Sequence, residues 1–476
     1  MKIECNGPLR HNSVNPRYFA DNSGQGVYLT GSHTWAVMTD MWPADEPRHT
    51  MDFNGFLQMM EDNGHNFLRF WQFALMTRGC PWNDVDTLFD PMPFQRTGPG
   101  LANDGEPKFD LNRFNEDYFH KLRSRIKDCE RHGIYASIMM FEGWSLKNED
   151  DRQPTWRCHV FNPDNNINGI TDNPLWANGR HWGVFSLDCP QILEAQKAFV
   201  RKVVDTVNDC DNVLYEICNE TPYTPEAMEW QTYMCAYIRD YEKTKPKQHM
   251  IGITPEGGIH SNREMMATNA DWISPASGDA GEYRYNPPAA DGKKVILNDT
   301  DHLWGHGCST AWVWKSFTRG HNVLFMDPWE PIPGELDWWL DGDISRNQRY
   351  YYAFGPVRSN LGYARDIALS FDLNCCVPDL SFCTSTYCLA NPNAQYVCYF
   401  PEGDTEGLNL TGLNGVFHIS WLEPKTGKTY QGTSIDVDAL AVKRAFLTVP
   451  FPGPGVLLFY KDRKTIRKHR SIYTNQ

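Results

Sequence analysis

The sequence predicts a (β/α)8 barrel followed by a small antiparallel β-sandwich. Short apolar or β-branched runs alternate with longer stretches of helical periodicity, which indicates βα units and a parallel sheet. Eight such units extend over about 340 residues, the size of a (β/α)8 barrel with insertions. From about residue 375 the pattern changes to short alternating segments broken by turn residues, which is typical of a β-sandwich.

The expected barrel strands are short apolar runs, as strands buried on both faces of a parallel sheet should be. In chain order they are Val27–Thr30, Asn66–Trp71, Tyr135–Phe141, Val213–Cys218, Met250–Ile253, Trp272–Pro275, Val295–Asn298 and Asn322–Met326. The clearest helices expected between them are Met51–Asn63, Phe114–His132, Pro190–Asp209, Thr224–Lys243 and Thr310–His321.

Three segments are expected along the chain. They are an N-terminal arm (residues 1–25), the barrel (residues 26–374) and the sandwich (residues 375–476). The largest insertion is expected in the third unit, over residues 142–188, which lack periodicity. A loop of this length is usually functional or disordered, and its four Trp residues favour order. It follows the carboxyl end of a barrel strand, where active sites lie.

The composition limits the classes of partner that the protein is expected to bind. A net charge of −14 opposes binding to nucleic acid or to an anionic membrane. No apolar run is long enough to cross a bilayer, and the N-terminus shows no apolar core of a signal peptide. Both a cytoplasmic protein and a secreted protein whose signal has been removed fit these observations. The 17 Trp and 21 Tyr suit either a large core or a carbohydrate ligand. The oligomeric state is not indicated.

The 14 cysteines form no CxxC pair and no grouping with zinc-ligand spacing. Many lie in apolar, strand-like segments, which favours small buried hydrophobic side chains. A bridge between Cys383 and Cys388 is the alternative for a secreted protein.

The segment that points to chemistry is the fourth strand, which ends abruptly in Asn219-Glu220. Polar residues at the carboxyl tip of a barrel strand are commonly catalytic. Hydrolysis of a glycosidic bond needs a partly desolvated acid that protonates the leaving oxygen, together with a second carboxylate at the anomeric carbon. Glu220 suits the first role. The second carboxylate is expected at the end of the seventh strand, where Asp299 and Asp301 share one face if the strand continues; Asp299 is preferred.

These residues resemble clan A glycoside hydrolases, the large group of retaining (β/α)8 enzymes. Asn219-Glu220 matches the clan's fourth-strand motif, which implies that Glu220 is the acid/base and that a seventh-strand carboxylate is the nucleophile. Arg69 resembles the clan's second-strand Arg, which contacts that nucleophile. The clan usually has Glu on the seventh strand, whereas this chain has Asp299, so Asp301 or an inverting geometry is the alternative.

Two longer segments resemble narrower families. NPRYFADNSGQGVYLTGSHTW is similar to the uncharacterised-domain family that includes apiosidases, and the C-terminal segment is similar to the small β-sandwich labelled collagen-binding. The first resemblance implies a side-chain sugar of pectin as substrate. The clan resemblance also implies that no metal or cofactor is needed, although Asp299, Asp301 and His302 could bind a divalent cation.

Further residues after strand ends are expected to contact a sugar, although each could equally be structural. Together with Arg69 and Asn219 they are His33, Trp35, Glu142, Trp144, His302, Trp304, His306, Asp327 and Trp329. The expected function is a retaining glycoside hydrolase acting on plant or microbial polysaccharides or oligosaccharides. The alternatives are a non-catalytic carbohydrate-binding protein on a barrel and, from the family label alone, a collagen-adhesion module. The chain contains no P-loop, GxSxG or HExxH motif.

Overall fold

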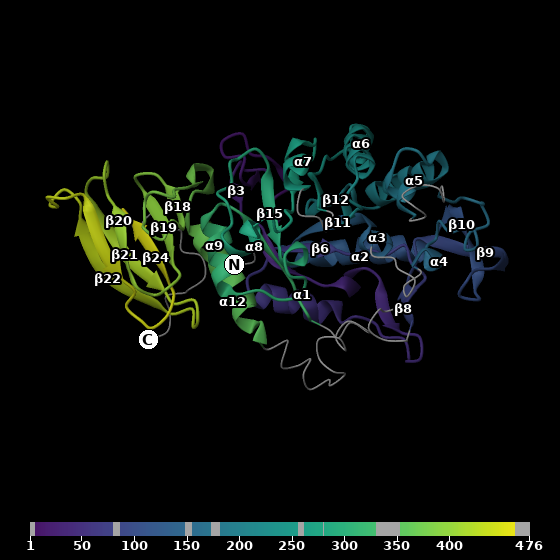
Figure 1. Ribbon diagram of the computed structural model, residues 1–476, viewed down its shortest axis with the longest axis horizontal. Helices are drawn as coiled ribbons and strands as arrows, with labels where there is room; N and C mark the ends of the chain where they lie inside the picture. Colours follow the sequence, from purple (N-terminus) through teal and green to yellow (C-terminus); the bar gives the residue numbers. More distant parts are fainter. Residues whose placement is uncertain are drawn as a thin grey trace.

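The computed structural model describes residues 5–79, 86–147, 155–172, 181–255, 261–278, 280–329 and 353–461. A barrel of parallel strands makes up the larger part, and an antiparallel sheet domain lies beside it at the C-terminal end (Figure 1). Both parts of the predicted fold class are therefore confirmed.

The barrel is a sheet of eight parallel strands. In chain order they are β4 (Thr30–His33), β6 (Phe67–Phe70), β11 (Tyr135–Glu142), β12 (Val213–Asn219), β13 (Ile251–Ile253), β14 (Trp272–Ile273), β15 (Val295–Asp299) and β16 (Asn322–Met326). Their order in the sheet is β4-β16-β15-β14-β13-β12-β11-β6. Every residue in these strands is buried, because side chains fill the barrel on one side and helices cover the other.

The first barrel strand was predicted three residues too early. The apolar run at Val27 belongs to a separate small sheet, and the barrel strand is Thr30–His33. This strand lies against β6, where a side chain at Gly31 would place its Cβ only 2.1 Å from the Phe67 carbonyl oxygen. The Asn66 backbone N–H donates to the Thr30 carbonyl, and the Thr30 N–H donates to Asn66 Oδ1, each at 2.9 Å. A strand of small residues therefore brings the two edges of the barrel sheet together.

The five predicted helices are all present. The principal helices are α1 (Phe53–Asp62), α2 (Glu116–Arg131), α5 (Pro190–Val207), α6 (Pro225–Glu242), α7 (Ser261–Ala267), α9 (Thr310–Thr318) and α12 (Gly355–Ser370). Local sequence determines where several begin: Thr224 caps α6 by accepting from the Ala227 N–H, with Pro225 in the first turn. Short turns of helix are α3 (Trp144–Lys147), α4 (Thr155–Cys158), α8 (Glu282–Tyr285), η1 (Trp35–Val37), η3 (Trp182–Phe185), η4 (Thr300–His302) and η5 (Leu373–Cys375).

Several short strands outside the barrel escaped prediction. The N-terminal arm forms a sheet of β1 (Arg10–His11), β2 (Phe19–Ala20) and β3 (Gly26–Val27), so its sheet extends two residues past the predicted boundary. A second sheet contains β5 (Asp40–Pro43), β7 (Thr77–Gly79) and β8 (Asp86–Asp90). The hairpin of β9 (Phe94–Leu101) and β10 (Pro107–Phe114) lies at the end of the molecule farthest from the C-terminal domain (Figure 1). The second unit therefore carries a long insertion as well as the third.

The C-terminal domain has two antiparallel sheets. The larger contains β17 (Val377–Pro378), β18 (Cys388–Asn391), β19 (Gln395–Phe400), β24 (Gly455–Tyr460), β21 (Val416–Leu422) and β22 (Thr429–Asp436), and the smaller β20 (Thr405–Asn409) and β23 (Arg444–Thr448). Cys383 and Cys388 are both free thiols.

The C-terminal domain and the barrel share one hydrophobic cluster. It joins Trp314 of α9 and Leu361 of α12 to Val397 of β19. Asn360 connects the two parts further: its Oδ1 accepts from Trp314 Nε1 at 2.7 Å, and its Nδ2 donates to the Pro424 carbonyl at 2.8 Å. The larger sheet therefore covers an outer flank of the barrel.

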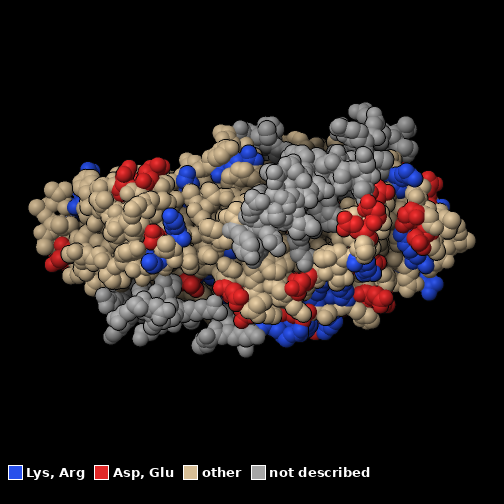
Figure 2. Space-filling view, turned by 90° about the horizontal axis from the view of Figure 1, so that it is seen from below, with Lys and Arg blue, Asp and Glu red and all other residues tan. Residues whose placement is uncertain are grey.

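The surface carries both acidic and basic side chains (Figure 2). Acidic and basic side chains are interspersed on the face that Figure 2 shows. None of the described helices is both long and apolar enough to cross a membrane.

Candidate active site

The candidate site lies at the carboxyl ends of the barrel strands, where the active sites of such barrels are found. Arg69 in β6 donates to four partners and, at 0% exposure, is wholly buried. The Arg69 cluster consists of Arg69, Glu216, Asn219, Asp299 and Asp301. Arg69 bonds Glu216 through two contacts of 2.6 and 2.9 Å, Asn219 Oδ1 at 2.8 Å, Asp299 at 2.9 Å and Asp301 at 3.0 Å. One guanidinium therefore ties β12 to the end of β15 across the barrel.

Removing Arg69 should cost much of the stability. Arg69→Met leaves the buried carboxylates of Glu216 and Asp299 without their cation, and loss of one partner from a buried ion pair typically costs about 3–5 kcal/mol. We expect the free energy of unfolding, measured by urea denaturation, to fall by about that amount. The matched control is Arg123→Ala, because the Arg123–Asp209 pair is exposed and should contribute less than about 1 kcal/mol. Equal losses in the two variants would contradict the role given to the Arg69 cluster.

Asp299 uses both carboxylate oxygens inside the protein. Its Oδ1 lies 2.9 Å from His33 Nε2 and accepts from the Asp301 backbone N–H at 3.0 Å, while its Oδ2 accepts from Arg69. Trp71 donates its indole N–H to His33 Nδ1, so His33 in turn donates from Nε2. Burial by itself raises the pKa of Asp299, but His33 and Arg69 outweigh it and hold that pKa well below its usual range.

Asp301 lies one short turn beyond Asp299. Asp299 caps η4, the 3-10 turn that carries Asp301 and His302, so Asp301 no longer follows the strand. Burial raises the pKa of Asp301 well above its usual range, and the nearby charges of Glu220 and Asp299 raise it further, against the effect of Arg69. One oxygen of Glu220, one of Asp301 and one ring nitrogen of His302 all lie within 4.8 Å of one another.

Glu220 has an unusual backbone conformation. Its φ is +50°, a left-handed value that non-glycine residues seldom adopt and that is often found at functional sites. The turn at Glu220 lies against Gly143, where a Cβ would be 2.6 Å from the Glu220 carbonyl oxygen. The Gly143 N–H donates to the Asn219 carbonyl at 2.7 Å. Gly143 therefore allows the end of the third strand to pack against the turn that presents Glu220.

His302 connects the fourth and seventh strand ends. Its Nε2 lies 3.0 Å from Asn219 Oδ1 and 3.3 Å from Asp301, and its Nδ1 lies 2.8 Å from Ser274 Oγ. Glu220, Asp301 and His302 are chemically able to bind a divalent cation. In this arrangement both His302 nitrogens already have hydrogen-bond partners, and a nitrogen that carries a proton cannot ligate a metal.

The aromatic residues predicted to line the site pack in separate groups. Trp35 is buried, and its ring lies 5.4 Å from that of Trp144 and 6.3 Å from that of His306. Trp304 packs edge-to-face on Trp312 of α9. Trp144, Trp304 and Trp329 are only partly buried, so each keeps some surface that a ligand can contact.

Two predicted carboxylates have structural partners. Glu142 Oε1 accepts from the Ser145 N–H at 2.7 Å at the start of α3. Asp327 is fully buried in an ion pair with Arg358 of α12, whose Nε donates to it at 2.7 Å. Each of these two carboxylates therefore has a partner within the protein.

Sequence reasoning missed Glu216, Trp71 and Ser274. The sequence could have indicated Glu216, because a charged residue inside an apolar strand needs a partner of opposite charge. Arg69 lies in another apolar strand and is such a partner. Ser274 had no such indication, because its role depends on the position of a histidine 28 residues away.

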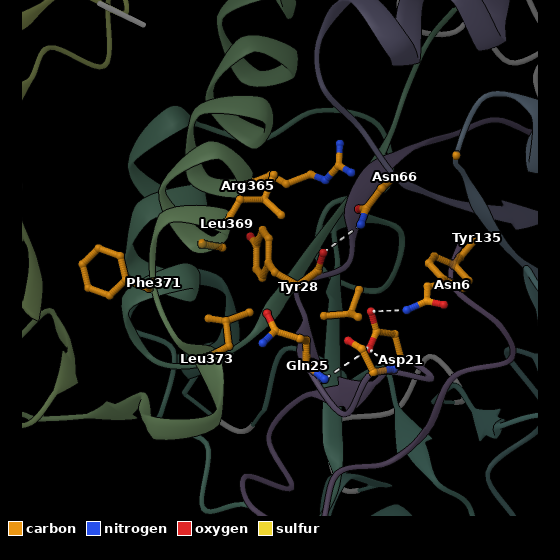
Figure 3. Close-up of a pocket in the computed structure, with 15 residues that line it drawn as sticks. Asn6, Asp21, Gln25, Tyr28, Asn66, Tyr135, Arg365, Leu369, Phe371 and Leu373 are labelled. Atoms are coloured by element: carbon orange, nitrogen blue, oxygen red, sulfur yellow. Dashed lines mark hydrogen bonds between the residues drawn. The ribbon is translucent and has the colours of Figure 1, made fainter. Parts of the chain in front are cut away.

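A pocket of about 440 Å³ lies at the opposite end of the barrel, between the N-terminal arm and α12 (Figure 3). Its polar groups serve the packing of the arm: Asn66 donates to the Tyr28 carbonyl at 2.9 Å, and Asp21 accepts from the Gln25 N–H at 3.1 Å. The pocket is therefore separate from the Arg69 cluster.

Solved structures with the same architecture are similar to most of the chain. A glycoside hydrolase family 5 protein from Bacteroides vulgatus ATCC 8482 has a TM-score of 0.60 at 13% identity, covering 96% of this chain and 94% of the other. A second structure, described as a glycoside hydrolase, has a TM-score of 0.59 at 13% identity and covers 96% and 97%. A family model described as a domain of unknown function, DUF6298, matches residues 82–260. No curated protein matches the sequence. The chain therefore has the fold of family 5 TIM-barrel proteins followed by a β domain.

Proposed function

We propose that the protein is a retaining glycoside hydrolase in which Glu220 is the acid/base and Asp301 is the nucleophile. The observation that carries this proposal is the approach of a Glu220 oxygen to within 4.8 Å of an Asp301 oxygen at the mouth of the barrel. Retaining enzymes hold their two carboxyl groups about 5–5.5 Å apart, whereas inverting enzymes leave about 6.5–9.5 Å for a water molecule. The short separation favours the retaining mechanism.

Asp301 suits the nucleophile better than Asp299, which the sequence favoured. A nucleophile needs an oxygen that can reach the anomeric carbon, and both oxygens of Asp299 are occupied by His33, Arg69 and a backbone N–H. Asp299 is 0% exposed, whereas the Asp301 side chain is 8% exposed. Asp299 then acts by capping the turn that presents Asp301.

The reaction has two steps. In the first, an Asp301 oxygen attacks the anomeric carbon while Glu220 gives its proton to the leaving oxygen, so that the glycosidic bond breaks and an ester to Asp301 forms. In the second, Glu220 takes a proton from water, whose oxygen attacks the same carbon and releases Asp301. Arg69 donates to Asp301 in the free protein and stabilises the carboxylate that leaves in the second step.

The proposal assigns Asn219 to binding the sugar. Its Oδ1 is occupied by Arg69 and His302, whereas its buried Nδ2 has no hydrogen-bond partner among the described residues. A sugar hydroxyl beside Glu220 would satisfy this donor. Partly buried Trp144 and Trp329 offer apolar faces for a sugar ring.

The substrate class is a plant or microbial polysaccharide or oligosaccharide. The similarity of the N-terminal segment to the apiosidase-containing family favours a side-chain sugar of pectin. The third-unit insertion, which follows the carboxyl end of β11, favours a groove closed at one end and release of short products.

The pH dependence of kcat/KM should reflect the raised pKa of Asp301. The nucleophile must be ionised, so kcat/KM is expected to fall as the pH drops through that pKa, above the ordinary value of about 4 for Asp. The ionised form of Glu220 contributes to the rise, and the first step on an aryl glycoside does not need the proton of Glu220. Glu220→Gln should therefore move this acid limb to lower pH on an aryl glycoside. An acid limb that stays in place would contradict the coupling of the two carboxyls.

A glycan panel tests the function itself. Wild-type protein should release sugar from at least one polysaccharide or oligosaccharide, and Glu220→Gln should release it from the same glycan at least about a hundredfold more slowly. Saturable binding without turnover, unchanged by Glu220→Gln, would instead favour a non-catalytic carbohydrate-binding protein.

A further inference from the structure

The direction of the hydrogen bonds around His302 follows from Arg69. A guanidinium only donates, so the atom of Asn219 that faces it at 2.8 Å must be the carbonyl oxygen. His302 Nε2 lies 3.0 Å from that same oxygen and 3.3 Å from Asp301, and both neighbours accept. His302 Nε2 must therefore carry a proton.

The other ring nitrogen faces Ser274. With the proton of neutral His302 on Nε2, its Nδ1 is an acceptor, and the Ser274 hydroxyl at 2.8 Å is the donor it needs. Ser274 follows β14 directly and is 0% exposed, and its backbone N–H donates to the Ile253 carbonyl. The hydroxyl is therefore held at a fixed place on the sixth strand.

We propose that Ser274 is a positioning residue that, together with Asn219, holds His302 in its Nε2-protonated form and so reinforces the orientation that Arg69 gives to the amide of Asn219 beside the two carboxylates. With Oδ1 accepting from both Arg69 and His302, the amide has one favourable orientation, in which Nδ2 points away from both. The catalytic consequence rests on the proposed function, whereas the choice of tautomer does not.

The opposite tautomer would disturb the site. A proton on Nδ1 would leave the Nε2 lone pair facing Asn219 Oδ1 and Asp301, so three acceptors would meet at one corner. The imidazole would have to rotate away, and Asn219 would lose one of its two orienting bonds.

Ser274→Ala tests the proposal, with Ser316→Ala as the matched control. Ser316 is another 0% exposed serine, and its hydroxyl accepts from Asn298 of the seventh strand. Nitrogen-15 NMR of the imidazoles reads the tautomer directly, with the His302 signals assigned from their loss in His302→Gln. Ser274→Thr retains a hydroxyl and should restore the wild-type pattern.

We expect wild-type protein and Ser316→Ala to show His302 protonated on Nε2, and Ser274→Ala to show a mixture of tautomers. On a hydrolysed glycan, kcat of Ser274→Ala should fall about fivefold to tenfold, the equivalent of one hydrogen bond, with KM changed less than about twofold. An unchanged tautomer in Ser274→Ala, or an equal loss of kcat in Ser316→Ala, would overturn the proposal. A changed tautomer in a protein that hydrolyses no glycan would leave the tautomer assignment standing and refute the proposed function instead.

Discussion

Asp301→Asn is expected to lower turnover by on the order of 10⁴-fold or more, because an amide cannot form the glycosyl ester on which the first step depends. The substitution keeps the size of the side chain and removes a carboxylate that is already crowded by Glu220 and Asp299. The protein should therefore stay folded, with a free energy of unfolding within about 1 kcal/mol of wild type. Initial rates on the substrate found by the glycan panel, together with urea denaturation, measure both effects.

Asp299→Asn should give the opposite pattern. Its negative charge lies fully buried between His33 and Arg69, so its loss should cost about 3 kcal/mol of stability. Turnover should fall less than in Asp301→Asn, since Asn can still cap η4 through its side-chain oxygen. If Asp299→Asn were the inactive variant and Asp301→Asn the unstable one, the two roles would have to be exchanged.

Glu220→Gln is expected to lower hydrolysis of natural glycans by about 10²–10⁴-fold, the usual contribution of a general acid. A sugar leaving group needs the proton that Gln cannot give. A nitrophenolate leaves without it, so the first step on an aryl glycoside should remain close to wild type in rate. Rates on paired substrates that differ only in the leaving group measure this dependence.

Glu142→Gln is the control for this experiment. Glu142 also follows a strand end, but its Oε1 accepts from the Ser145 N–H at the start of α3. Its replacement should lower rates on both substrates by the same factor, if at all. A leaving-group dependence in Glu142→Gln, or its absence in Glu220→Gln, would point to a different acid.

Much of the fold could be predicted because each barrel strand is buried on both faces. Asn322–Met326 is such a run, and its predicted bounds equal the observed ones. The first strand, Thr30–His33, differs because its residues are small or polar and form no apolar run. Its close approach to β6 leaves no room for a side chain at Gly31. The β9–β10 hairpin was missed because most of its residues are half-buried or exposed, with few apolar side chains to indicate a strand.

The grouping of several candidate residues could be predicted, whereas their roles stay predictions. Glu220, Asn219 and Arg69 follow from polar or charged side chains in or at the ends of apolar strands. The structure bonds Arg69 to Asn219, Asp299 and Asp301 and brings an oxygen of Glu220 within 4.8 Å of one of Asp301. The expectation that Asp299 and Asp301 share one face assumed that the strand continues. In the structure the strand ends at Asp299, and the next three residues form η4. The side chain of Asp299 caps this turn, and the strand pattern of the sequence does not show that cap.

The measurement that tests the central claim most directly is the mass of Glu220→Gln protein mixed with an excess of aryl glycoside. The first step should proceed, and the second should stall without its base, so the protein should gain the mass of one glycosyl group. Proteolysis and fragmentation of the modified peptide should then place that group on Asp301 and not on Asp299. A glycosyl group on any other residue, or hydrolysis by wild-type protein that inverts the anomeric configuration, would contradict the account.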